Sequence, residues 1–162
     1  MDHDIDLFLS IAEIAGVFVG FGALISFSRD QAEAHSALRA VVTIGLLVLV
    51  AALLPVGLAR YGLPDRILWV WSSMGFLLIN WIAIVVLFLD RESRSSITTD
   101  VKANLGLSIL FWVFLEVPVQ VPLVLVIVGV KRTLAPAFYT TGLVLNLFEA
   151  AFLLARLVLV RN

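Results

Sequence analysis

The chain has 162 residues, of which 62% are hydrophobic and 14% are charged, and its mean hydropathy is +1.10. A soluble domain is typically about half apolar and about a quarter charged, so this composition excludes an ordinary soluble protein and indicates a chain embedded in a bilayer. The formal net charge of −1 provides no basic field for nucleic acid, and the absence of cysteine excludes disulfides, thiolate zinc sites and iron–sulfur clusters.

Hydrophobic segments long enough to cross a bilayer follow one another along almost the whole sequence. A spanning helix needs about 20 apolar residues. The fold class predicted is all-α: a polytopic integral membrane protein with one transmembrane domain over residues 1–162 and no soluble domain. Five transmembrane helices are predicted, at about residues 5–27, 30–61, 66–90, 100–130 and 134–160. The acidic N-terminus lacks the positive region of a cleavable signal, so the first segment is interpreted as a retained helix.

The first segment carries a stripe of small residues. Ala12, Gly16 and Gly20 are four residues apart and share one helix face, a pattern that allows two helix backbones to approach closely in lipid. Packing within the chain and a contact between subunits both explain this stripe. Glu13 borders it, and is either part of an ion-binding group or a side chain that reaches the membrane surface by snorkelling.

The third segment begins with two tryptophans, Trp69 and Trp71. Tryptophan is enriched at the two membrane–water interfaces, because its ring is apolar and its N–H is polar. We therefore predict that both rings lie in an aromatic belt at the membrane surface. Asn80 lies about two to three turns deeper in the same helix.

The fourth segment contains polar residues and prolines whose burial in a membrane costs free energy. Glu116 and Gln120 must find partners away from water, while Pro118 and Pro122 each remove a backbone donor. We predict a kink, or hinge, at the two prolines. The carbonyls that they free are either ligands for a cation or are bonded by neighbouring hydroxyls or water.

A count of depth places several polar residues at one level. An α-helix rises 1.5 Å per residue, and the fourth segment runs opposite to the third and the fifth. Asn80, Glu116 and Glu149 then fall about 20 Å from the same surface, with Gln120 and Asn146 within about a turn of that level. Two carboxyls at low dielectric repel when both are ionised, and no lysine or arginine shares their depth. We therefore expect either a proton on one of them or a cation between them.

Two functions are compatible with this layer. The first is an oligomeric channel or small carrier for a cation or proton. The residues that would bind or relay the ion are Glu116, Glu149, Gln120, Asn80, Asn146 and Glu13. Five helices cannot enclose a wide pore alone, so the chain is expected to form a homo-oligomer. The alternative is a non-transporting partner or assembly subunit of another membrane protein, in which the polar layer is structural.

Other classes have less support in the sequence. An intramembrane enzyme is not expected, because there is no Asp-Asp pair or His-Glu-x-x-His motif and both histidines lie outside the apolar segments. We expect no cofactor and no nucleic-acid partner, and the sequence does not indicate a metal. The expected location is the plasma (inner) membrane. The distribution of lysine and arginine favours an N-terminus outside and a C-terminus in the cytoplasm.

Overall fold

The computed structural model describes residues 2–27, 32–89 and 116–159. Within these ranges the chain is helical and contains no strand, which confirms the predicted all-α class for this part of the molecule. The elements are α1 (Asp2–Phe27), α2 (Ala32–Ala59), α3 (Asp65–Leu89), α6 (Val117–Val128), the short 3-10 helix η2 (Arg132–Leu134) and α7 (Ala135–Leu159).

Four of the described helices are long and apolar enough to cross a membrane: α1, α2, α3 and α7. This agrees with a multi-pass membrane protein. The remaining described α-helix, α6, is apolar but has 12 residues, fewer than a bilayer crossing requires. The predicted fourth segment extends back to about residue 100, and its first part lies outside the described residues. The fifth crossing and the kink at Pro118 and Pro122 therefore stay predictions.

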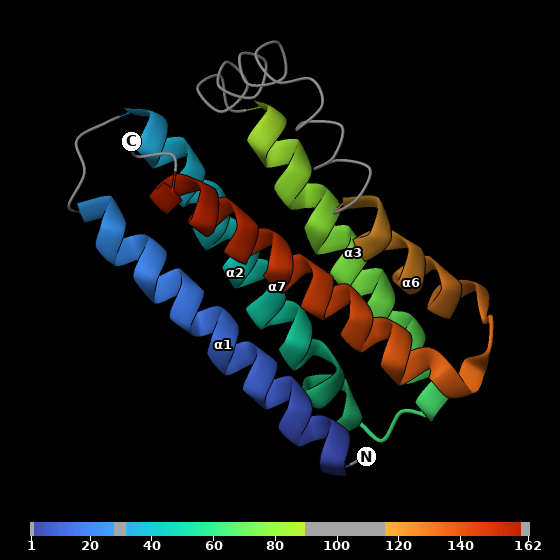
Figure 1. Cartoon of the computed structure of the whole chain (residues 1–162). Helices are drawn as coiled ribbons and strands as arrows, with labels where there is room; N and C mark the ends of the chain where they lie inside the picture. The colour runs from blue at the N-terminus through green and yellow to red at the C-terminus, as the bar shows by residue number, and fades with distance from the viewer. Residues whose placement is uncertain (1, 28–31, 90–115, 160–162) are drawn as a thin grey trace.

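The helices lie side by side in a bundle in which consecutive helices run in opposite directions (Figure 1). Helix α2 packs against α1, α3 and α7, and α6 packs against α3 and α7. Helix α1 begins at one end of the bundle and α7 ends at the other (Figure 1). Because α3, α6 and α7 all contact one another, side chains on their facing sides can form one buried group.

Helix α6 ends at Val128, and its C-cap residue Gly129 begins the turn that leads to α7. Gly129 has φ of 85°, a left-handed conformation that glycine adopts without a steric penalty. Its N–H donates to the carbonyls of Leu125 and Val126, and the N–H of Val130 also donates to Leu125. These bonds satisfy carbonyls that the end of the helix would otherwise leave open. The turn brings the start of α7 beside the end of α6.

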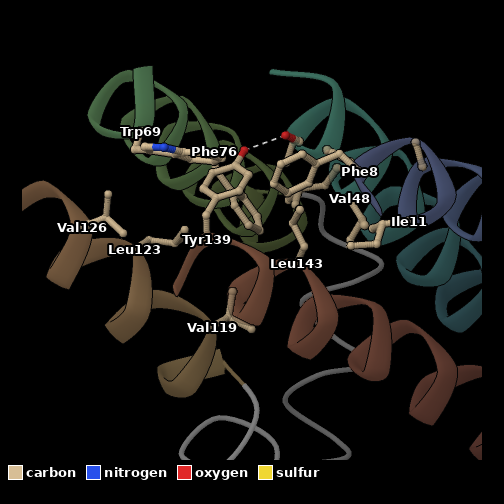
Figure 2. Close-up of a cluster of buried hydrophobic side chains, with 14 of the residues drawn as sticks. Phe8, Ile11, Val48, Trp69, Phe76, Val119, Leu123, Val126, Tyr139 and Leu143 are labelled. Carbon is tan, nitrogen blue, oxygen red and sulfur yellow. Dashed lines mark hydrogen bonds between the residues drawn. The ribbon is translucent and has the colours of Figure 1, made fainter. Parts of the chain in front are cut away.

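The centre of the bundle holds four aromatic rings (Figure 2). Tyr139 of α7 contacts the rings of Phe8 of α1 and of Trp69 and Phe76 of α3, and Phe8 also contacts Trp69, with ring centroids 5.7–5.9 Å apart. The aromatic-belt prediction is wrong for Trp69, which is 7% exposed, whereas Trp71 is 58% exposed. The two residues are two positions apart in the helix and so lie on different faces, and only Trp69 turns toward the core.

A proline within α2 is compensated by the ring at the centre of this cluster. Pro55 has no N–H, so the carbonyl of Ala51, four residues earlier, receives no helical hydrogen bond. The buried hydroxyl of Tyr139 donates to this carbonyl at 2.6 Å (Figure 2). A side chain of α7 thus supplies the donor that α2 lacks.

Candidate functional site

Six polar side chains are buried in the described part of the bundle, and they come from the three helices that contact one another. They are Ser72, Ser73 and Asn80 on α3, Glu116 directly before α6, and Asn146 and Glu149 on α7. On α3 they share the face that also carries Trp69 and Phe76, so core packing turns these polar groups inward.

Glu116 is held by two amide donors. Its Oε1 atom accepts a hydrogen bond of 2.8 Å from Nδ2 of Asn80 and one of 2.9 Å from Nε2 of Gln120. Gln120 lies one turn further along α6, while Asn80 reaches across from α3. Hydrogen bonds to an ionised carboxylate are stronger than those between neutral groups. The two amides therefore fix the position of this carboxyl and compensate part of its charge.

Helix α7 carries the second carboxyl. Asn146 and Glu149 lie three residues apart on one face of the helix and are 1% and 3% exposed. No described residue is hydrogen-bonded to either amide atom of Asn146. A buried amide with neither donor nor acceptor satisfied is unfavourable and rare in folded proteins.

The close approach of α6 and α7 sets these residues opposite Glu116. A Cβ added at Gly142 would lie 3.4 Å from the carbonyl oxygen of Val119, so glycine allows the two helices to meet here. The helices are antiparallel, so one turn beyond Gly142 corresponds to about one turn before Val119. Asn146 therefore lies at the level of Glu116, and Glu149 follows it by about one turn of α7.

Among the side chains whose burial the structure describes, no buried counter-charge accompanies the two carboxyls. The basic side chains described there are all exposed: Arg39, Arg60, Arg66, Lys131 and Arg132. Removing an ionised carboxylate from water is costly unless a partner compensates the charge. Three oxygen-bearing side chains are thus available to a proton or a cation: Glu116, Asn146 and Glu149. Among the described residues no group of three or more His, Cys, Asp or Glu forms a metal centre.

Comparison of the chain with protein-family models, with curated proteins and with solved structures finds no match. The arrangement of these side chains is therefore the basis for the function proposed below.

The residues expected from the sequence to bind or relay an ion fall into two groups. Asn80, Glu116 and Gln120 form the hydrogen-bonded cluster, with Asn146 and Glu149 buried on the adjoining helix. Glu13 lies apart from them, because its side chain is exposed on the surface of α1. Glu13 is therefore not one of the buried polar side chains, and its role in ion binding stays a prediction.

The small-residue stripe of α1 is only partly used inside the chain. Ala12 is buried, and a Cβ on Gly16 would lie 3.8 Å from Leu49, but nothing lies within 4 Å of one on Gly20. Tighter contacts of α1 with α2 are made elsewhere: an added Cβ would lie 2.7 Å from the side chain of Val42 at Gly22, and 2.8 Å from the side chain of Val19 at Gly45. Gly20 is therefore open to lipid or to a second molecule.

Tyr139 is a structural residue that the sequence analysis did not identify. The signal was present in α2, because Pro55 leaves the Ala51 carbonyl without its helical donor. Any compensating donor had to come from a neighbouring helix, and Tyr139 is one of the two tyrosines in the chain. Which helix faces Ala51 could not be read from the sequence.

Proposed function

We propose that this protein is an oligomeric membrane channel or small carrier for a cation or proton. The observation that carries the proposal is the pair of buried carboxyls, Glu116 and Glu149, beside the unpartnered amide of Asn146, with no buried cation among the side chains whose burial the structure describes. Ionisable residues within membrane segments are costly, and in membrane proteins they mark ion pathways and proton relays.

The two carboxyls have different surroundings, which suggests different roles. Glu116 is fixed by Asn80 and Gln120 and provides a stationary negative charge. Glu149 has no hydrogen bond from a described residue, so its carboxyl is the one free to take up and release an ion. Asn146, on the same face of α7, offers an amide oxygen to a cation or to a protonated group. The ion would thus bind to and leave Glu149 on α7, while the carboxyl of Glu116 beside α6 stays in place.

The described helices of one chain are too few to enclose a wide pore. We propose that residues 100–130 form the fifth crossing, kinked at Pro118 and Pro122, and that copies of the chain associate. The open face at Gly20 is the contact suggested by the sequence, since small residues allow helices to approach closely in lipid. The proposed location is the plasma (inner) membrane, with the N-terminus outside and the C-terminus in the cytoplasm.

Flux in liposomes tests the proposal. The purified protein is reconstituted, and proton and alkali-cation fluxes are measured under an imposed gradient. The double variant Glu116→Gln, Glu149→Gln removes both charges but keeps the side-chain size, so we expect flux to fall to that of protein-free liposomes. Asp6→Asn is the matched control, because Asp6 is an exposed carboxyl on α1. Unchanged flux in the double variant would refute the roles assigned to the two carboxyls.

A second function is favoured by one observation. The bonds of Glu116 to Asn80 and Gln120 tie α3 to the start of α6, which a purely structural network would also do. The chain would then be a non-transporting, membrane-embedded partner or assembly subunit of another protein. Isolation of a second membrane protein in fixed stoichiometry, combined with absence of flux from the chain alone, would establish this alternative.

A further inference from the structure

Two serines on α3 have an unusual environment. Ser72 and Ser73 are both fully buried, and neither hydroxyl has a hydrogen-bond partner in the described part of the chain. A hydroxyl within a helix normally donates to the carbonyl four residues earlier when no other partner is near. Thr43, Thr140 and Thr141 do so in this bundle, at 2.8–2.9 Å. The hydroxyls of Ser72 and Ser73 do not make this bond.

These serines and Asn146 are enclosed by a single chain. Because each is at most 1% exposed, neither a lipid nor a second copy of the chain can reach the unpaired atoms. A buried polar group needs a hydrogen-bond partner, and water is the partner small enough to enter the interior of a protein. Both amide atoms of Asn146 and both serine hydroxyls are therefore suitable water ligands.

The serines lie between the polar layer and one end of the bundle. Ser73 is about 10 Å along α3 from Asn80, and Ser72 is about 10 Å from the start of the helix. At that end a depression of about 350 Å³ is lined by polar side chains that include Asp65, Arg66 and Thr133. Its lining also includes Trp69, which lies one turn of α3 from the two serines. Along α3, the serines therefore lie between this depression and the polar layer.

We propose that internal water bound by Ser72, Ser73 and Asn146 hydrates the polar layer from the end of the bundle where α3 and α7 begin. Water at these positions would complete the hydrogen bonds of all three side chains. Entry of the transported ion by this hydrated route rests on the proposed function. Binding of water by these side chains is independent of that function. The route would provide one half of an alternating or continuous path to Glu149.

Silver ions test this route directly. The chain has no cysteine, so Ser72→Cys and Ser73→Cys each introduce a single thiol into the unaltered protein. Silver reacts with a thiolate, and a thiol ionises only where water reaches it. The reconstituted variants are treated with silver for increasing times, and the remaining free thiol is counted after denaturation by maleimide labelling and mass spectrometry.

The matched control lies on the same helix at nearly the same depth. Met74 is exposed on the outer side of α3, where lipid would surround it, so Met74→Cys should stay unreacted. We expect silver to block the thiol of Ser73→Cys at least about tenfold faster than that of Met74→Cys. Equal, slow blocking in both serine variants and in the control would overturn the proposal. If Ser72→Cys does not fold, Ser73→Cys provides the same test.

The two proposals fail in different ways. Rapid blocking of the serine variants without any flux from the native protein would refute transport and leave the hydrated route standing. Flux from the native protein together with thiols as inert as the control would refute the route and leave transport standing.

Discussion

Replacement of Tyr139 by phenylalanine isolates a single hydrogen bond at the centre of the bundle. The variant keeps the ring that packs on Phe8, Trp69 and Phe76, and removes only the hydroxyl that donates to Ala51. The carbonyl of Ala51 then loses its donor, because Pro55 cannot supply one. We expect the free energy of unfolding to fall as a result.

The expected magnitude follows from the burial of the bond. A buried polar group left without a partner costs about 1–3 kcal/mol in proteins generally. Hydrogen bonds between membrane helices have measured values that average about 0.6 and reach about 1.7 kcal/mol. The Tyr139 side chain is fully buried and its bond is short, at 2.6 Å, so we expect a value near the upper end, about 1–1.5 kcal/mol.

A double-mutant cycle with Pro55→Ala supplies the decisive comparison. Alanine at position 55 restores an N–H that can donate to Ala51, so the tyrosine hydroxyl is no longer needed there. In that background Tyr139→Phe should cost less than about 0.5 kcal/mol. Unfolding is measured in mixed detergent micelles by far-ultraviolet circular dichroism. An equal cost in both backgrounds would show that the hydroxyl does not compensate the proline.

Two further variants test packing and the polar cluster. Asn80→Ala removes one donor from Glu116, and should lower the free energy of unfolding by about 1–2 kcal/mol in the same assay, because a buried carboxyl loses a partner. Gly45→Ala places a Cβ 2.8 Å from Val19, so we expect a loss of about 1 kcal/mol or more despite the better helix propensity of alanine, whereas Gly20→Ala, with open space around it, should be neutral or stabilising. A stable Gly45→Ala protein would contradict the close approach of α1 to α2.

Several elements of the fold could be predicted because apolar length alone determines them. The runs that became α1, α2, α3 and α7 are long and apolar enough to span a bilayer, and their ends fall near the predicted ones. The depth count placed Asn80 and Glu116 at one level, and the structure joins them by a hydrogen bond. Residue number and helix rise are sufficient for such a statement, since they fix position along the membrane normal.

Rotation of each helix about its axis could not be predicted in the same way. Within a bilayer both faces of a helix are apolar, so hydropathy does not distinguish a face in the core from one in lipid. The inward turn of Trp69 and the packing of Gly45 on α1 both depend on this rotation. The pairing of Tyr139 with Ala51 depends in addition on which helices are neighbours, and 88 residues separate the two in sequence.

The Tyr139–Ala51 bond has a consequence for the order in which the protein is assembled. During synthesis α2 enters the membrane before α7 is made, so the open carbonyl created by Pro55 must wait in lipid for its donor. Docking of the last helix closes that gap and at the same time completes the aromatic cluster. A chain that ends before α7 would keep the Ala51 carbonyl of its second helix without a donor.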